Sequence, residues 1–211
     1  MQRGGSQEDE IVGFFHPIHD ETTIFIPSRK GGEAEALNRL NAFATANNLL
    51  IFQVLASGEM LAVHFHSKYD GRKALELLKP QALPKSGSKR NSKYAEQARP
   101  FRLRAEQCFT LATHYLGFNG WSTEIVAVAE SEEEQVLVAN VNLMDGRVSQ
   151  GIGVCMKANI PIPREEQLKI ATSAALQAAF GRLHLVLLDG VCKYVYIVDS
   201  CSPPPVLKVD G

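Results

Sequence analysis

The sequence lacks an uninterrupted apolar segment near twenty residues, the length of a helix that crosses a bilayer, so we expect no membrane span. Its first ten residues contain no apolar signal-peptide core and are more acidic than a typical transit peptide. Four cysteines form no Cys-x-x-Cys pair and no compact cluster; they are Cys108, Cys155, Cys192 and Cys201. This spacing predicts reduced thiols in the cytosol or nucleus, and neither a zinc site nor a disulfide framework.

Motifs of catalysis are absent as well. The chain has no G-x-S-x-G, no H-E-x-x-H and no P-loop, and Gly151-Ile152-Gly153 lacks the third glycine of a dinucleotide site. His16-Pro17-Ile18-His19 is too local to make a convincing metal site. Without a nucleophile and base, a carboxylate pair or a metal cluster, we expect no enzyme activity, no cofactor, no metal and no small-molecule substrate.

The charge of the chain is nearly balanced, with 22 basic residues, 23 acidic residues and a net charge of −1. That balance by itself argues against a nucleic-acid binder. The distribution is uneven, because residues 79–104 carry eight basic side chains and a single acidic one, Glu96. The flanking segments, 1–78 and 105–211, each carry more acidic than basic residues. We interpret the central segment as an electrostatic footprint for an anionic partner; a solvated linker without a partner is the alternative.

A length of 211 residues and a hydrophobic content of 45% permit one large domain or two small ones. The apolar pattern of the first part predicts strands and helices in the order strand 22–27, helix 33–47, strand 49–55, strand 60–65 and helix 68–78. This β-α-β-β-α order indicates an RNA-recognition-motif-like, ferredoxin-like domain over residues 16–85, with a fourth strand near Gln81–Lys85. Residues 1–15 are predicted to be a disordered N-terminus.

In an RNA-recognition motif, bases stack on aromatic residues of the two central strands. Phe25 stands at the position of the first strand's aromatic residue. The third strand, "GEMLAVHF", keeps its last aromatic residue, Phe65, but places Met60 and Ala62 where two stacking residues usually stand. Each lost platform removes on the order of 1–3 kcal/mol per base. We therefore predict a degenerate motif that serves as a docking or weak binding surface.

A basic linker, residues 86–100, follows this domain. Lys89, Arg90 and Lys93 are candidates for phosphate contacts or for a nuclear-localisation patch. The next four residues, Phe101-Arg102-Leu103-Arg104, alternate apolar and basic side chains, which is typical of an edge strand.

The second domain is predicted over residues 101–200, with a tail at 201–211. It begins with a helix whose apolar residues recur at spacings of three and four and which ends at Gly117. Asn119-Gly120 forms a tight turn, and a β-branched strand starts at Trp121. Two strands joined at Asp145-Gly146 and an alanine-rich helix after Pro163 complete an α-β-β-β-α order. A final hairpin, 183–188 with 191–198, is apolar on both faces, so we expect another part of the molecule or a second subunit to cover it.

The segment "LATHYLGFNGWSTEI" resembles the start of the DNA-binding core of the Rad fifty-two single-strand annealing family. The structural motif that carries this resemblance is a turn between a helix and the first strand of a meander, made by Gly117, Phe118, Asn119, Gly120 and Trp121. The order of the two domains is similar to that of the Rad fifty-two motif-containing proteins of vertebrates, in which an RNA-recognition-motif-like domain precedes the same core.

The resemblance implies a non-catalytic protein of the DNA-damage response or recombination that binds single-stranded or distorted DNA, or RNA. It also implies a location in the nucleus and in the cytoplasm, and self-association as a homodimer or higher oligomer. A groove that holds a single strand needs Lys and Arg donors along its length. Arg102 and Lys157 fall close to positions that are basic in the family, and the same core contributes Arg104 and Lys169. The family's final helix carries a Lys-Arg pair where this chain has Leu176-Gln177-Ala178, which argues against strong annealing.

The sequence leaves two other functions open. The first is a protein-interaction scaffold that keeps the fold but has lost nucleic-acid binding, which the acidic halves and the missing stacking residues favour. The second is a binder of double-stranded RNA, because α-β-β-β-α is also the order of that domain. Such a domain normally has a lysine cluster at the start of its last helix, where this chain has Arg164-Glu165-Glu166.

Overall fold

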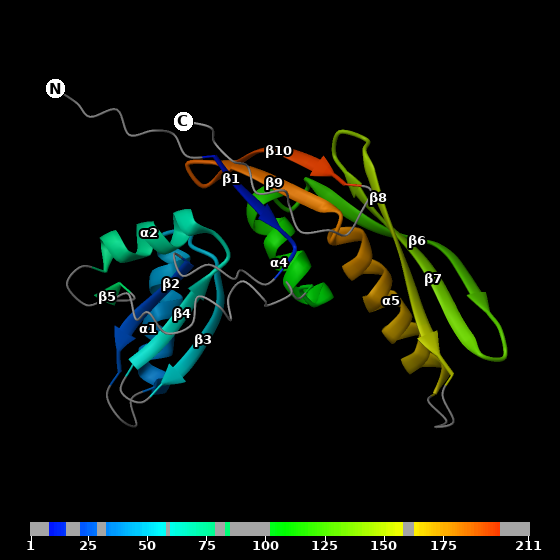
Figure 1. Cartoon of the computed structure of the whole chain (residues 1–211), viewed down its shortest axis with the longest axis horizontal. Helices are drawn as coiled ribbons and strands as arrows, with labels where there is room; N and C mark the ends of the chain where they lie inside the picture. The colour runs from blue at the N-terminus through cyan, green and yellow to red at the C-terminus, as the bar shows by residue number, and fades with distance from the viewer. Residues whose placement is uncertain are drawn as a thin grey trace, which may run out of the picture. The chain divides into compact units, whose positions relative to one another are not determined.

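The structure is a computed structural model of the chain and describes residues 9–15, 22–28, 33–57, 60–78, 83–84, 102–157 and 163–198. The chain divides into two compact units. One comprises Met1–Glu10 and His16–Pro100, and the other comprises Ile11–Phe15 and Phe101–Gly211. Both units combine helices with antiparallel strands, so the predicted α+β class is confirmed (Figure 1).

The first unit contains a four-stranded sheet with two helices. Its elements are β2 (Thr23–Pro27), α1 (Glu33–Ala46), β3 (Ile51–Ser57), β4 (Met60–Phe65), α2 (Lys68–Leu77) and β5 (Leu83–Pro84). The strand order is β3-β4-β2-β5, with β2 and β4 in the centre. This confirms the RNA-recognition-motif-like arrangement, and the short β5 lies within the predicted fourth strand.

Alternation along the central strands builds the core of this unit. Ile24, Val63 and Phe65 point toward the helices and are buried with Leu40 of α1 and Ala74 of α2. Because successive side chains of a strand point to opposite faces, the neighbouring residues of β2 and β4 are left for the other face of the sheet. A buried serine caps α2, since the Asp70 N–H donates to Ser67 Oγ at 3.0 Å.

The second unit contains two three-stranded sheets. Its elements in chain order are α4 (Ala105–Leu116), β6 (Trp121–Glu130), β7 (Glu134–Leu143), β8 (Val148–Met156), α5 (Arg164–Phe180), β9 (Leu183–Leu188) and β10 (Val191–Ile197). One sheet has the order β6-β7-β8, which is the predicted meander. The other has the order β1-β9-β10, where β1 is Asp9–Gly13.

Strand β1 corrects the prediction that residues 1–15 are disordered. Residues 9–13 hydrogen-bond as an edge strand beside β9, and Phe14 and Phe15 continue into the core with exposed fractions of 1% and 9%. The segment is ordered because its apolar run, Ile11-Val12-Gly13-Phe14-Phe15, buries apolar side chains in the core, which a polar segment cannot do. The disorder prediction failed because it extended the polar composition of the first ten residues across this run.

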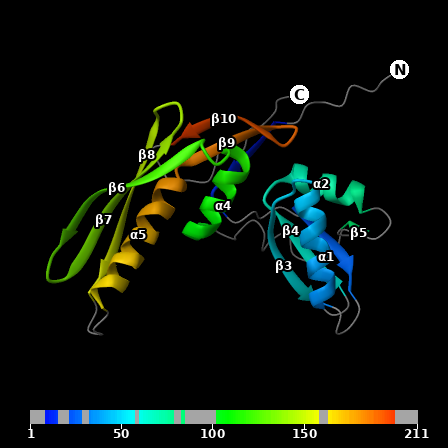
Figure 2. The ribbon, with the colours of Figure 1, turned by 180° about the vertical axis from the view of Figure 1, so that it is seen from behind.

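Two glycines bring α5 into close contact with β8. Gly151 and Gly153 face the helix, and a Cβ atom on Gly153 would lie 1.9 Å from the Ala171 carbonyl oxygen and 2.4 Å from the Ala175 nitrogen. The Ser149 hydroxyl donates to the Ala179 carbonyl at 2.7 Å. The helix therefore packs through its alanines on β7 and β8, along one face of the sheet (Figure 2). The glycine pair therefore has a structural role in the packing of this helix on the sheet.

The predicted turn motif connects α4 to β6. Gly117 has a φ of +81°, and a Cβ on Gly120 would lie 2.1 Å from the Leu116 carbonyl oxygen. The turn places Trp121 in an aromatic cluster with Phe109, Phe180 and, through Phe180, Phe14. The glycines are needed for the close reversal, and the tryptophan anchors the start of the strand in the core.

The final hairpin is covered only in part within the chain. Strand β9 is covered as expected, since Leu183, Leu185 and Leu187 are buried beside β1 and β10. The described part of the chain leaves strand β10 exposed, because Tyr194 is 63% and Tyr196 is 56% exposed, and coverage by a second subunit stays a prediction. The hairpin pattern indicated two apolar faces because tyrosine was counted with the apolar residues, although its hydroxyl is compatible with water.

Candidate nucleic-acid interface

Two arginines enter the second unit on opposite sides of a buried leucine. Leu103 is 1% exposed, and its N–H donates to the Phe14 carbonyl at 3.3 Å. Arg102 forms an antiparallel β-bridge with Phe15, which confirms the predicted strand-like alternation. Because Leu103 is fixed in the core, Arg102 and Arg104 are held at the surface with exposed side chains. The segment therefore presents two guanidinium groups on a backbone that is anchored on both sides.

The two arginines differ in their local electrostatics. The Nε of Arg102 lies beside Gly181, which caps the carboxyl end of α5, where the helix dipole favours a cation. Arg104 is the N-cap of α4, at the positive end of that helix dipole, and its backbone N–H donates to Gln107 Oε1 at 3.0 Å. This end of the helix favours a bound anion rather than the arginine itself. Within the described parts of the chain, neither guanidinium has an ion-pair partner. Their donors are therefore available to an external anion.

Lys157 is placed differently. Its ammonium donates to Glu130 Oε1 at 2.9 Å and to the Ser131 carbonyl at 2.6 Å. Arg164, the first residue of α5, contacts the other oxygen of Glu130 at 3.2 Å. The hydrogen bond from Lys157 holds the pKa of Glu130 below its usual range. Lys157 is thus committed to a pairing within the protein that the sequence did not reveal.

The predicted cations do not gather at one point of the core. Lys157 lies near the start of α5 through Glu130 and Arg164, whereas Arg102 lies at the end of the same helix. A helix of 17 residues is about 25 Å long. Lys169 is exposed on α5 between these two ends. The arrangement is therefore a spaced row of cations, and Leu176-Gln177-Ala178, near the end of α5 between Lys169 and Arg102, carries no charge.

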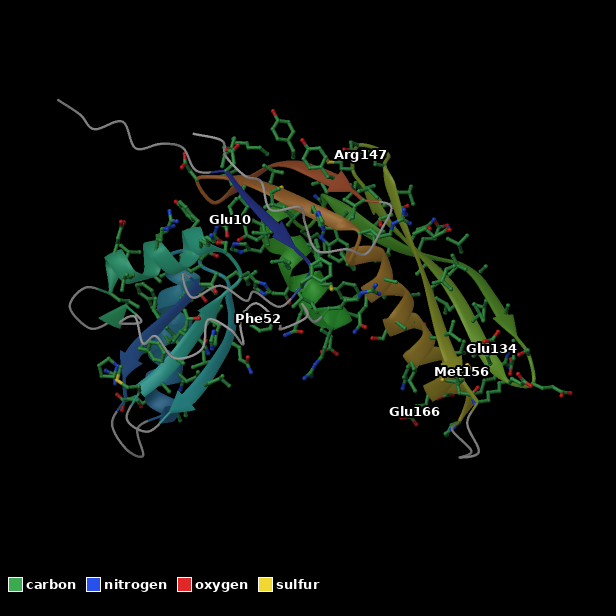
Figure 3. The ribbon with its side chains drawn as sticks, in the orientation of Figure 1. Glu10, Phe52, Glu134, Arg147, Met156 and Glu166 are labelled. Atoms are coloured by element: carbon green, nitrogen blue, oxygen red, sulfur yellow. The ribbon has the colours of Figure 1, made fainter. Side chains whose placement is uncertain are left out.

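Acidic side chains occupy the end of the core where Lys157 lies. Figure 3 shows Glu134 and Met156, which pair across β7 and β8, close to Glu166 at the start of α5. Arg147 lies at the opposite end of the same sheet (Figure 3). The acidic residues repel phosphate at the end of the sheet where Glu134 and Glu166 lie. The start of α4 and the Arg147 end are therefore the more suitable surfaces for a polyanion.

The sheet of the first unit offers one aromatic residue at a stacking position. Phe25 of β2 lies opposite Ala62 of β4, and Pro27 lies opposite Met60. Phe65 is fully buried toward the helices, so it is a core residue and no platform. Met60 and Ala62 therefore provide no aromatic platform on β4, as predicted. Among the described positions of the two central strands, Phe25 is the phenylalanine that remains for stacking.

Of the turn motif, Trp121 is structural and Phe118 is exposed. The Phe118 side chain is 85% exposed, and Asn119 is also exposed. The adjacent β7–β8 turn exposes Met144 to 82%, and the Met144 N–H donates to the Gly120 carbonyl at 3.1 Å. The two turns thus lie side by side at one end of the β6-β7-β8 sheet.

A surface hollow that sequence reasoning missed lies at this end. It has a volume of about 460 Å³ and lies between the end of α4, the β7–β8 turn and β10. The Tyr-x-Tyr spacing of β10 with an adjacent lysine was the signal that could have indicated it. The lining residues are Tyr115, Leu116, Asp145, Arg147, Cys192, Lys193, Tyr194, Val195 and Tyr196.

Three of the candidate cations, Lys89, Arg90 and Lys93, lie outside the described residues. The described residues contain no group of three His, Cys, Asp or Glu side chains that could hold a metal ion. No helix within the described ranges is both long and apolar enough to cross a membrane. Cys108 is buried, which raises the pKa of its thiol to about 12 and makes it a core residue and not a reactive nucleophile.

Sequence comparisons relate the chain to known proteins. The family model for the RDM1 DSRM domain matches residues 103–175, from the buried Leu103 through the meander into α5. RAD52 motif-containing protein 1 of Danio rerio is 26% identical over 220 residues, covering 86% of this chain and 79% of that protein. The Mus musculus protein of the same name is 23% identical, with 85% and 78% covered, and the Macaca fascicularis protein is 26% identical, with the same coverage. These matches confirm the resemblance to the Rad fifty-two motif-containing proteins.

Proposed function

We propose that this chain, a relative of RAD52 motif-containing protein 1, is a non-catalytic protein that binds single-stranded or distorted DNA, or RNA. The similarity to that protein and to a DSRM domain supports a nucleic-acid-related function. We assign it to the DNA-damage response or recombination, in the nucleus and also in the cytoplasm, on the same similarity. Imaging of a tagged full-length chain before and after DNA damage tests this assignment, and a distribution that damage leaves unchanged would argue against it.

The proposal rests on the exposed pair Arg102 and Arg104. Both guanidinium groups lie on a segment whose backbone is anchored, so little backbone freedom is lost when a phosphate binds. Arginine is also suited to bidentate contact with phosphate. Lys169 is a further exposed cation on α5. Contacts of this kind hold the backbone of a nucleic acid with little dependence on sequence.

A second candidate function is binding of double-stranded RNA. The DSRM family model matches the α-β-β-β part of the core and the first turns of α5, and this match favours it. The start of α5 argues against it, because Glu165 and Glu166 are exposed there and Arg164 is paired with Glu130. A double-stranded ligand of that domain type is held largely through its phosphates and 2′-hydroxyls, which an acidic helix start disfavours.

The test is fluorescence-anisotropy titration of the full chain with a labelled thirty-nucleotide DNA strand, its duplex and the RNA of the same sequence, across a salt series. We expect Arg102→Glu and Arg104→Glu each to weaken single-strand binding at least about tenfold, since each removes a charge-assisted hydrogen bond. The log-log salt slope should fall by about 0.7 for each phosphate that the variant no longer binds. Arg39→Glu is the matched control, because Arg39 is exposed on α1 and pairs with Glu35.

The outcomes separate the candidates. Tighter binding to duplex RNA than to the single strands would select the second function. An equal weakening of binding by Arg39→Glu and by the two core variants would show that only net charge matters and would remove the assigned site. No binding of any probe at low salt would overturn the proposal and leave a scaffold whose partner is another protein.

A further inference from the structure

We infer that the hollow between the end of α4, the β7–β8 turn and β10 is a base-stacking site for single-stranded nucleic acid, with Tyr194 and Tyr196 as the platforms. This inference rests on the proposed function and adds a second contact region to it. The hollow lies at the end of α4 remote from Arg102 and Arg104, since Tyr115 and Leu116 of the last turn of that helix line it. The two regions are separated by a helix of 12 residues, about 18 Å.

The two tyrosines have the arrangement of a stacking surface. They are two positions apart on one strand, so their side chains point to the same face with Cα atoms roughly 7 Å apart. Each exposes more than half of its side chain, 63% for Tyr194 and 56% for Tyr196. Aromatic rings on a strand are the usual platforms for unpaired bases, and they bind all bases because each base has a π-face.

A β-bulge places a lysine beside these rings. The register of β10 against β9 shifts between Cys192, which pairs with Leu187, and Tyr194, which pairs with Val186. The residue inserted is Lys193, and a bulge of this kind redirects a side chain from the regular alternation. Lys193 lines the same hollow and is exposed, and it has no ion-pair partner among the described residues. Its ammonium is therefore available to the phosphate that joins two stacked bases.

Arg147 forms the fixed wall of the hollow. Its Nε donates to Asp145 Oδ2 at 2.8 Å, and its Nη1 donates to the Val195 carbonyl of β10. The hydrogen bonds from Arg147 hold the pKa of Asp145 below its usual range, so the pair stays ionised and nearly neutral in sum. These bonds attach the β7–β8 turn to β10 and keep the hollow open beside the rings. Lys193 is thus the cation of the site, and Arg147 positions the backbone.

A protein partner is the competing occupant of such a surface, because tyrosine and arginine are common at protein interfaces. Two observations favour a nucleic acid. The arginine is already bound to Asp145, so Lys193 is the lining residue whose charge has no ion-pair partner among the described residues. The rings also belong to the unit that presents Arg102 and Arg104, so a single strand that contacts the arginines can continue along the same unit.

The experiment combines cross-linking with affinity measurements on the full chain. A twenty-nucleotide DNA strand with one 5-iodouracil is irradiated in the complex, and the cross-linked residue is identified by mass spectrometry. We expect cross-links at Tyr194 or Tyr196. Tyr194→Leu/Tyr196→Leu should weaken binding of the unmodified strand by about tenfold or more, whereas Tyr194→Phe/Tyr196→Phe should stay within about twofold, because phenylalanine retains the π-face. Val191→Ala is the matched control on β10, since Val191 is 54% exposed and does not line the hollow.

Each outcome decides the inference. If the wild-type chain binds no strand, the proposed function fails and the inference fails with it. If binding depends on Arg102 and Arg104 but is unchanged in the leucine pair, with cross-links elsewhere, the function stands and the stacking site is overturned. If the leucine pair binds the strand normally but no longer binds a defined protein ligand, the surface serves a protein and the inference is again overturned. Should the leucine pair misfold by circular dichroism, the phenylalanine pair and the cross-link position decide.

Discussion

The indole ring of Trp121 stacks on the ring of Phe109, with centroids 5.4 Å apart and an interplanar angle of 29°. Phe180 meets both rings edge-on at 5.5 and 5.7 Å. The three residues come from β6, α4 and α5, so this cluster joins the strand that follows the turn motif to both helices of the core. The turn with the sequence Gly-Phe-Asn-Gly-Trp therefore contributes to stability through its last residue.

Replacing Trp121 with alanine should strongly destabilise the second unit. Truncation of a large buried aromatic side chain typically costs about 3–5 kcal/mol in the free energy of unfolding, and because Trp121 is half-buried we expect the lower part of that range. We expect Phe118→Ala to change that free energy by less than about 0.5 kcal/mol, because Phe118 is 85% exposed. Urea denaturation followed by circular dichroism measures both variants, since Trp121 is the single tryptophan and its loss removes the fluorescence probe. Equal effects of the two substitutions would contradict the structural role of the cluster.

Gly153→Ala should separate α5 from β8. The added Cβ would lie 1.9 Å from the Ala171 carbonyl oxygen, and both partners are backbone atoms of regular elements that cannot move alone. Overpacking of this kind costs about 1–3 kcal/mol and at times more, and we expect the upper part of that range. The measurement is the urea midpoint of the variant beside that of Ile152→Ala, which lies on the opposite face of β8 and is 60% exposed. A Gly153→Ala protein as stable as the Ile152 control would show that the helix does not contact the strand this closely.

Lowering the pH should stabilise the first unit through Asp70. Burial raises the pKa of this carboxyl to about 6, and the nearby Glu10 carboxylate raises it further. Hydrogen bonds from the Leu50 N–H and from Ser67, together with the charge of Lys73, lower the pKa but do not cancel the effect of burial. Because the folded-state pKa exceeds the unfolded value near 3.9, the contribution of Asp70 is fully present below about pH 4 and is lost as the pH rises through 6. At pH 7 the difference from pH 4 is of the order of 2–3 kcal/mol.

The matched variant for this prediction is Asp70→Asn, whose amide oxygen can still accept the Leu50 N–H bond that Asp70 Oδ2 accepts at 3.1 Å. Urea unfolding of the variant and of the wild type is measured from pH 4 to pH 7.5. The wild-type stability relative to the variant should fall across this interval. A constant difference between the two proteins would mean that Asp70 titrates at its ordinary pKa.

The elements that the sequence predicted well are those with a clear local pattern. The β-α-β-β-α order of the first unit and the helix-turn-strand around Trp121 depend on periodicity and turn residues that lie within short segments. Strand β1 was missed because it is short and its partner β9 lies about 170 residues later in the chain, a pairing that no local pattern reveals.

In the candidate site, too, the features set by a local pattern were predicted and those set by contacts between distant segments were not. The sequence predicted the exposure of Arg102 and Arg104 because the two arginines alternate with Leu103. In such a pattern the apolar side chain is buried and the charged side chains on both sides stay in water, as the structure shows. The pairing of Lys157 with Glu130 depends on the register of β6, β7 and β8, and the sequence alone could not show which of the nearby acidic residues it would meet. The exposure of Tyr194 likewise depends on which face of β10 the rest of the unit covers.

Lys157 should contribute little to nucleic-acid binding despite its position in the row of cations. Its ammonium is bound to Glu130 and Ser131, so a phosphate would have to displace an existing ion pair. We expect Lys157→Gln to weaken single-strand binding less than about twofold, against about tenfold for Arg102→Glu. Glu130→Gln should release the lysine, so the same anisotropy titration should show tighter binding and a salt slope steeper by up to about 0.7. If Lys157→Gln instead weakens binding as much as Arg102→Glu, the lysine leaves Glu130 in the complex, and the acidic end of the sheet would have to be included in the binding surface.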